Sequence, residues 1–261
     1  MTVFRGRVPK IAAVAVAVLL GTALLAGASF VLLAPRIPSA APSVSQSPGP
    51  DFAVPAEAPP AAAEPTGPGV AGLVDAGWVV KVSAASGIPE RALAAYAGAA
   101  IAKSRAMPTC GLGWTTLAGI GLVESDHGRH GGSSVGADGT VTPPIFGIAL
   151  DGSASSHIPD SDGGLLDGDP NFDRAVGPMQ LIPQTWRNWH TDGNGDGVED
   201  PQNIDDAVVA TSNYLCRASG DMASRDGWRA GVLAFNGSGA YAQSVANAAN
   251  RYAKAAADAG R

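Results

Sequence analysis

Apolar residues between residue 71 and residue 258 recur at the spacing of an α-helix. Residues three, four and seven positions apart share one face of a helix. In residues 89–106 this stripe consists of Leu93, Tyr96, Ala97 and Ile101. The same pattern predicts a series of helices over 71–86, 89–106, 114–127, 178–189, 201–218, 226–236 and 238–258. Ser238 is a suitable N-cap for the last of them.

Residues 128–173 break this periodicity and are rich in Gly, Asp, Ser and Pro. We predict a long loop here, with room for a hairpin at the short apolar stretch 144–150. A loop of this length inside a compact domain is usually functional or mobile. The chain has no internal repeat and no run of alternating strands. The predicted fold class is therefore mainly α, with small local β elements.

The N-terminal part has a different character. Residues 11–34 form an uncharged, mostly apolar run of 24 residues, long enough to cross a bilayer as a helix. Arg5, Arg7 and Lys10 precede it, which predicts that residues 1–10 stay in the cytoplasm. The alternative is a cleaved signal peptide, whose apolar core is usually about 7–15 residues, with small residues at 26–29 as the cleavage site. We favour an uncleaved anchor; in both cases the remainder is extracytoplasmic.

Residues 35–70 resemble a spacer. Positions 37–70 contain nine Pro and eight Ala, and their only aromatic residue is Phe52. Such a composition favours a semi-rigid, polyproline-like tether, which at roughly 3 Å per residue could reach about 100 Å. We therefore expect one globular domain over residues 71–261.

Charge and cysteine content narrow the functional classes. Beyond residue 36 the chain has 13 Lys and Arg against 23 Asp and Glu, which argues against a nucleic-acid partner. The only two cysteines are Cys110 and Cys216. In an oxidising compartment such a pair is expected to form a disulfide, worth roughly 4–5 kcal/mol for a loop of this length.

Glu124 is the first candidate for catalysis. Leu117, Ile120 and Gly121 lie seven, four and three residues before it, so they share its helical face. Apolar surroundings raise the pKa of a carboxyl group, and a raised pKa is what a general acid needs at neutral pH. The alternative interpretation is a glutamate near a helix end that simply reaches solvent.

A second candidate site is a calcium loop. Positions one, three, five and six of an EF-hand loop are matched by Asp192, Asn194, Asp196 and Gly197. The carbonyl of Val198 would supply position seven. Asn203 stands where the usual acidic residue at position twelve would be, so Asp205 or Asp206 would close a longer loop. We expect a structural Ca²⁺ here, although an acidic Gly-rich turn that binds nothing has the same composition.

Four motifs occur in a fixed order, behind the predicted anchor. They are Glu124-Ser125 ahead of Gly128, the segment 175–183 (AVGPMQLIP), the loop 192–206, and Phe235-Asn236-Gly237-Ser238 leading to Tyr241. In this arrangement, residues 75–255 resemble the peptidoglycan lytic transglycosylases of the membrane-bound B type, in the actinobacterial form with an N-terminal anchor.

The resemblance implies a lysozyme-like α+β fold and cleavage between N-acetylmuramic acid and N-acetylglucosamine, leaving a 1,6-anhydromuramic end. It assigns the catalytic acid to Glu124 and substrate contacts to Ser125, Gln180, Asn236 and Tyr241. Phe235 replaces a tyrosine that is frequent in the family, so one hydroxyl is missing. The implied partner is the glycan strand of the cell wall, and no organic cofactor is implied.

The chemistry implied for Glu124 needs one carboxylic acid, whereas most glycosidases use two. Asp126 cannot be a partner, because residues two apart do not face each other on a helix. Asp173 is a possible second acid for the first alternative, a hydrolytic muramidase. The second alternative is a non-catalytic wall-binding module or scaffold.

Overall fold

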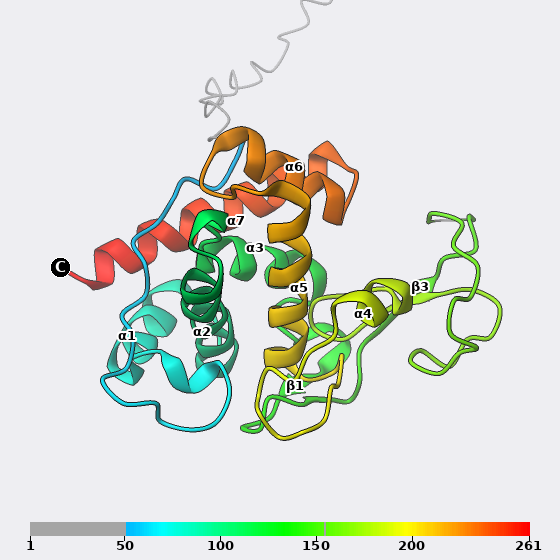
Figure 1. Cartoon of the computed structure of the whole chain (residues 1–261), viewed down its shortest axis with the longest axis horizontal. Helices are drawn as coiled ribbons and strands as arrows, with labels where there is room; N and C mark the ends of the chain where they lie inside the picture. The colour runs from blue at the N-terminus through cyan, green and yellow to red at the C-terminus, as the bar shows by residue number, and fades with distance from the viewer. Residues whose placement is uncertain (1–50, 154) are drawn as a thin grey trace, which may run out of the picture. The chain divides into compact units, whose positions relative to one another are not determined.

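The computed structural model describes residues 51–153 and 155–261 (Figure 1). The cytoplasmic segment 1–10, the predicted anchor 11–34 and the first part of the spacer, 35–50, lie outside the described residues. Within the described part the chain forms seven α-helices and two small antiparallel sheets, which confirms the predicted mainly α fold class. None of these helices combines the length and the apolar character that crossing a membrane requires.

The helices follow the predicted order along the chain. They are α1 (Ala76–Ser86), α2 (Glu90–Ala106), α3 (Trp114–Ser125), α4 (Pro183–Trp189), α5 (Ile204–Ser219), α6 (Arg225–Phe235) and α7 (Gly239–Ala259). Short 3-10 turns occur at η1 (Ala71–Leu73), η2 (Pro108–Cys110) and η3 (His130–Gly132). Ser238 caps α7 as predicted, since its side chain accepts a hydrogen bond from the Tyr241 amide.

Two predicted helices begin later than expected. The predicted helix 71–86 is split, because the Asp75 side chain accepts a hydrogen bond from the Trp78 amide and starts α1 there. The predicted helix 178–189 begins only at Pro183. Before it, Val176 and Leu181 exchange backbone hydrogen bonds of 2.9 and 3.1 Å, and the residues between them form a tight turn. The helical prediction for 178–182 was therefore wrong.

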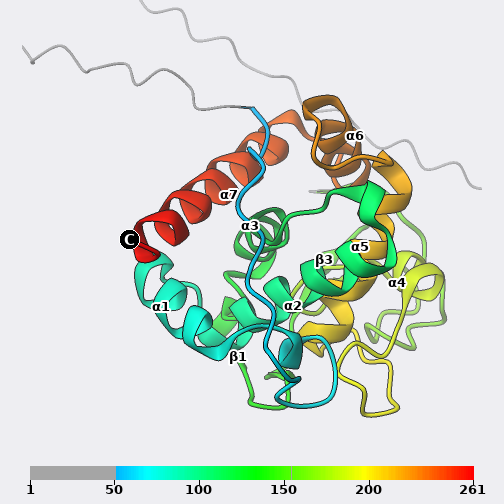
Figure 2. The ribbon, with the colours of Figure 1, turned by 60° about the vertical axis from the view of Figure 1, so that its left-hand side comes forward.

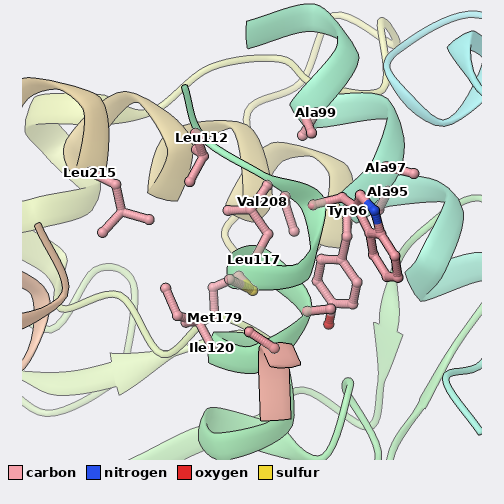
Figure 3. Packing of buried hydrophobic residues seen from close by; sticks show 14 of the residues in the cluster. Ala95, Tyr96, Ala97, Ala99, Leu112, Leu117, Ile120, Met179, Val208 and Leu215 are labelled. Atoms are coloured by element: carbon pink, nitrogen blue, oxygen red, sulfur yellow. The ribbon is translucent and has the colours of Figure 1, made fainter. Parts of the chain in front are cut away.

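Helix α3 lies at the centre of the helical domain, with α1, α2, α5 and α7 around it (Figure 2). Every residue from Trp114 to Gly121 is buried, as expected for a helix that is apolar on all sides. Leu117 and Ile120 of α3 meet Met179, Val208 and neighbouring side chains in the core (Figure 3). The C-terminal end of α3, where Glu124 lies, is therefore held by a packed core.

Three of the four strands lie in the region 128–173 that was predicted as a loop, and β4 directly follows it. Strand β1 (Ser134–Val135) pairs with β2 (Val141–Thr142), and β3 (Phe146–Ala149) pairs with β4 (Arg174–Val176). The predicted hairpin at 144–150 is half right, because β3 forms there but its partner lies after a connection of more than twenty residues. Strand β4 leads directly into the turn before α4.

Residues 51–70 were predicted as part of the spacer, but they lie against the helical domain. The side chain of Asn250 in α7 donates to the carbonyl of Phe52 and accepts from the amide of Val54. The indole of Trp114 donates to the carbonyl of Glu57. Side chains of the helical domain thus form hydrogen bonds with backbone groups of residues 51–70, a Pro-rich strap that forms no helix. The folded part of the chain therefore begins earlier than residue 71.

The predicted disulfide is confirmed. Cys110 in η2 and Cys216 in α5 are bonded, with 5.4 Å between their Cα atoms and a sequence separation of 106 residues. The bond joins the segment that precedes α3 to the helix that packs beside it.

Candidate active site

Glu124 lies in the last turn of α3 and is half-buried. Its Oε1 accepts a hydrogen bond of 2.6 Å from the hydroxyl of Tyr241 in α7. Burial raises the pKa of Glu124 to about 7, and the Tyr241 hydrogen bond only partly opposes this rise. At neutral pH a substantial fraction of Glu124 is therefore protonated, as a general acid requires.

No other carboxylate contributes to the raised pKa of Glu124 among the described residues. Asp126, two positions further on, is exposed and pairs with Arg129 at 2.8 Å. Asp173 is fully buried elsewhere, where its carboxylate accepts hydrogen bonds from the amide and the hydroxyl of Ser161. The environment of Glu124 is thus that of a single acid set by burial rather than of a coupled carboxylate pair.

The chain turns sharply after Glu124. Asp126, His127 and Gly128 all have positive φ angles, of 51°, 60° and 80°. The amide of His127 donates to the carbonyl of Gly121, which closes the end of α3. Left-handed backbone at two consecutive non-glycine residues is uncommon and costly, so the surrounding contacts must stabilise it.

Ser125 joins this turn to the segment before α4. Its side chain is 2% exposed, and its Oγ donates to the carbonyl of Pro178 at 2.6 Å and accepts from the amide of Gly128 at 2.8 Å. Both hydrogen bonds of the Ser125 hydroxyl are therefore made to groups of the protein itself. Ser125 thus holds two turns together, and a contact between Ser125 and substrate stays a prediction.

Gln180 occupies the turn that Ser125 holds. Its φ angle is +49°, and it is half-buried, whereas the preceding Met179 is fully buried. Its Nε2 donates to the carbonyl of Gly177 at 3.0 Å. Its Oε1 lies beside Gly147 of β3, where an added Cβ would approach it to 3.0 Å. Gln180 is therefore half-buried and anchored at its amide, between the turn and β3.

Asn236 and Tyr241 come from the connection between α6 and α7. Asn236 is the C-cap residue of α6 and is exposed, and its Oδ1 accepts from the amide of Ser238 at 3.2 Å. Ser238 in turn caps α7, and Tyr241 lies in the first turn of that helix. The motif thus fixes the start of α7 so that the Tyr241 hydroxyl reaches Glu124.

A row of aromatic rings leads to Glu124. The rings come from four helices: Trp189 (α4), Tyr214 (α5), Phe235 (α6) and Tyr241 (α7). Successive ring centroids are 6.2, 5.9 and 6.4 Å apart, and the last pair is stacked. Trp189, Tyr214 and Phe235 are half-buried, whereas Trp114, Trp186 and Trp228 belong to the core.

The sequence did not point to this aromatic row. Its members lie between residues 189 and 241, and each belongs to a different helix, so no spacing rule connects them. Neither Trp189 nor Tyr214 was singled out from the sequence as a candidate site residue. The weak signal that was present is the position of Phe235 directly before Asn236.

The predicted calcium loop is built around two carboxylates. Asp192 accepts hydrogen bonds from the amides of Gly195 and Gly197. Asp206, which is fully buried, accepts from the amides of Gly193 and Asp200. Burial is the largest cause that raises the pKa of Asp206 to about 6, and the charge of Asp192 adds to it.

The structure distinguishes the two residues proposed to close the loop. Asp205 points away from it and pairs with Arg91 of α2. Asn203, at position twelve, caps α5 by accepting from the amide of Asp205. Asp206 is therefore the side chain that remains with the loop. Asp196 and Val198 are exposed along its rim, and Asn194 is half-buried.

A second acidic cluster was not expected from the sequence. Among the described residues, the group of acidic, His or Cys side chains close enough to share an ion consists of Asp160, Asp162 and Asp173, with ligand atoms within 4.8 Å of one another. All three lie between β3 and β4. The carboxylates of Asp192, Asp196 and Asp206 are not gathered as closely.

No protein-family model matches the chain, and no curated protein or solved structure matches it. The functional interpretation therefore depends on the four sequence motifs and on the geometry around Glu124.

Proposed function

We propose that this protein is a lytic transglycosylase, a carbon-oxygen lyase that cleaves the bond between N-acetylmuramic acid and N-acetylglucosamine in peptidoglycan. The observation that supports this most strongly is Glu124. It is a half-buried carboxyl group with a pKa near 7, hydrogen-bonded to Tyr241. Its environment allows it both to donate a proton and to take one back near neutral pH.

In the proposed reaction, protonated Glu124 donates its proton to the glycosidic oxygen as the bond to the muramic anomeric carbon breaks. The sugar's own acetamido group stabilises the positive charge that develops at that carbon. The Glu124 carboxylate then takes the proton from the muramic 6-hydroxyl, whose oxygen bonds to the anomeric carbon. Glu124 returns to its protonated form, and no water is consumed.

The cause of the raised Glu124 pKa favours this route over hydrolysis by a retaining mechanism. A retaining glycosidase places its second carboxyl group about 5–5.5 Å from the first, and an inverting one about 6.5–9.5 Å away. At the shorter separation a charged carboxylate would help to raise the pKa of Glu124, yet burial is the cause that raises it. Asp173 already accepts two hydrogen bonds from Ser161.

The surrounding side chains suit a sugar polymer. The faces of half-buried aromatic rings bind the apolar faces of sugars, and amides bind their hydroxyl and acetamido groups. The row from Trp189 to Tyr241 offers such rings next to Glu124. Gln180 and Asn236 offer amides, and Asn236 is exposed. We propose that these residues bind the glycan on either side of the scissile bond.

We further propose a structural Ca²⁺ in the loop 192–206. Its oxygen donors would be the side chains of Asp192, Asn194, Asp196 and Asp206 and the carbonyl of Val198. Two carboxylates that face one another there, one of them fully buried, fit a divalent cation, which would offset their repulsion. Ca²⁺ would hold the segments before and after the loop, α4 and α5, in place.

The proposed location is the outer side of the cell membrane. The predicted anchor 11–34 would hold the protein there, and the glycan strands of the wall would be its partner. The strap 51–70 lies on the domain, so the extended tether is shorter than the predicted spacer.

Mass spectrometry of muropeptides tests the proposed activity. The full-length chain in detergent micelles is incubated with purified peptidoglycan, beside the Glu124→Gln variant and the control Glu64→Gln. Glu64 is an exposed glutamate of the strap, so its replacement should change nothing. We expect anhydro products about 18 Da lighter than hydrolytic muropeptides from the wild type and the control, and none from Glu124→Gln.

Each other result would overturn part of the proposal. Products with a reducing end would make the protein a muramidase. Activity retained in Glu124→Gln would remove Glu124 from the mechanism. Absence of products from a folded, Ca²⁺-supplied wild type that still binds peptidoglycan would favour a wall-binding module.

A further inference from the structure

His127 is a buried imidazole three residues after Glu124, and the proposed reaction does not use it. It is 1% exposed and lies between α2 and α7. Its Nδ1 is 3.2 Å from the hydroxyl of Tyr96, and its Nε2 is 2.9 Å from the hydroxyl of Tyr252. Both tyrosines are also buried. Both ring nitrogens thus have a partner from a different helix.

This arrangement suits a neutral imidazole. A neutral ring has one N–H donor and one acceptor nitrogen, so one tyrosine can accept and the other can donate. Burial lowers the pKa of His127 to about 4; nearby Arg129 and Arg251 favour the same direction, and Asp126 opposes it. The imidazole therefore stays uncharged at neutral pH and is fully hydrogen-bonded.

Helix α7 contacts the end of α3 at two points. Tyr241 binds Glu124, and Tyr252 binds His127. These tyrosines are eleven residues apart, close to three helical turns, so they share one face of α7. Because Glu124 and His127 flank the last residues of α3, α7 fixes both sides of the turn that ends this helix.

Helix α2 fixes the same turn from the opposite side. The Tyr96 ring packs beside α3 (Figure 3) and reaches past Gly121. An added Cβ on Gly121 would lie 2.0 Å from the Tyr96 hydroxyl. The carbonyl of Gly121 accepts the hydrogen bond from the His127 amide. A glycine at this position thus lets the tyrosine, the imidazole and the helix end come together.

We infer that His127, clamped between Tyr96 and Tyr252, is a positioning residue that holds the Glu124 carboxyl against Tyr241. We call these three side chains the clamp. It also holds Gln180 in place, because the hydroxyl of Ser125, in the turn that ends α3, donates to the carbonyl of Pro178 in the turn that contains Gln180. The left-handed backbone of His127 is the strained conformation that the clamp stabilises. The inference rests on the proposed function only for its effect on turnover.

Two conservative variants of the full-length chain test the clamp. Tyr252→Phe removes one hydroxyl and keeps the ring. His127→Gln keeps a polar side chain at a left-handed position, a conformation that Gln180 adopts in this same chain. Val82→Ala is the control, because Val82 is a buried residue of α1 and its truncation destabilises the core away from Glu124.

The first readout does not depend on activity. The chain has five glutamates, so carboxyl-labelled glutamate gives few NMR signals, and the signal missing from Glu124→Gln identifies Glu124. We expect the pKa of Glu124 to fall toward its ordinary range in Tyr252→Phe and His127→Gln, because a loosened helix end admits water. In Val82→Ala it should equal the wild-type value.

The second readout is turnover of peptidoglycan. We expect kcat to fall about 10- to 100-fold in Tyr252→Phe and His127→Gln, the effect of a misplacement of about 1 Å, with KM nearly unchanged. The alkaline limb of the kcat profile should move to lower pH together with the Glu124 pKa. Val82→Ala should lower only the thermal midpoint.

The outcomes separate the clamp from the proposed function. A wild-type kcat and Glu124 pKa in folded Tyr252→Phe and His127→Gln would overturn the inference and reduce His127 to a core residue. A shifted Glu124 pKa in these variants of a protein that cleaves no peptidoglycan would support the clamp and refute the transglycosylase activity.

Discussion

Replacing Glu124 by glutamine should stabilise the protein at neutral and alkaline pH while it abolishes turnover. Glutamine has nearly the shape of a protonated glutamic acid, and its side-chain oxygen can still accept the hydrogen bond from Tyr241. It cannot ionise, however. The variant therefore removes the free-energy cost of a carboxylate in a half-buried site and leaves the packing at the end of α3 in place.

The magnitude follows from the pKa of Glu124, which rises from 4.5 to about 7 on folding. Between these values the folded protein keeps a proton that the unfolded chain has lost. The free energy of unfolding therefore falls as pH rises through this window, by about 1.4 kcal/mol for each pH unit. The full loss is at most about 3 kcal/mol, complete above pH 7 and absent below pH 4.5.

The assay is urea unfolding of the full-length chain in detergent micelles, followed by tryptophan fluorescence near pH 4, pH 6 and pH 8. All five tryptophans lie in the described part of the chain. We expect the free energy of unfolding of Glu124→Gln, relative to wild type, to increase by up to about 3 kcal/mol between pH 4 and pH 8. Glu64→Gln should show no such increase.

His127 changes stability with pH in the opposite direction, because its pKa falls from 6.5 to about 4 on folding. The unfolded chain binds the extra proton in this window, so stability is lost as pH falls from 6.5 to 4. This contribution is common to wild type and Glu124→Gln and cancels in their difference. A difference that is constant with pH, or that favours the wild type at pH 8, would refute the assignment of Glu124 as a buried acid.

Three further changes probe other parts of the structure. Replacing Cys110 and Cys216 by alanine should lower the free energy of unfolding by about 2–5 kcal/mol, measured in urea against the oxidised wild type. Phe235→Ala should raise KM for glycan strands about tenfold or more, with the fold intact by circular dichroism, because it interrupts the aromatic row. Ca²⁺ should raise the thermal midpoint of the wild type, and EDTA should reverse this. Asp206→Asn should abolish the increase, whereas Asp162→Asn should retain it; the opposite pattern would move the ion to the second acidic cluster.

The helical order could be predicted from the sequence because each helix buries its own apolar stripe. All seven predicted helices occur in the predicted order, five of them with approximately the predicted extent, and the Ser238 cap lies at the predicted residue. The disulfide could also be predicted, since the chain has only two cysteines. These features depend on local spacing or on simple counting.

The errors come from tertiary contacts that local spacing does not contain. The segment 178–182 has helical composition, but the hydrogen bond from Ser125 to Pro178 and the pairing of Val176 with Leu181 hold it as a turn. The strap 51–70 has the composition of a spacer, but Asn250, which is distant in sequence, forms hydrogen bonds with two of its backbone groups.

In the candidate site, too, features that depend on local spacing could be predicted and features that depend on tertiary contacts could not. Glu124 could be found because its apolar neighbours lie on its own helix, within seven residues. The aromatic row, the imidazole of His127 and the acidic cluster at Asp160 could not, because their members meet only after distant elements pack together.

The environment of Glu124 combines two requirements that oppose each other. Burial at the end of α3 gives the carboxyl a pKa suited to proton transfer near neutral pH, but the same burial destabilises the fold whenever the carboxyl ionises. The turn after Glu124 adds strain through the left-handed Asp126 and His127. The two tyrosines that bind His127 support this turn, whereas the Cys110–Cys216 bond lies before the opposite end of α3. Replacing Glu124 by a residue that cannot ionise would remove the cost of ionisation, which is the effect that the unfolding experiment on Glu124→Gln measures.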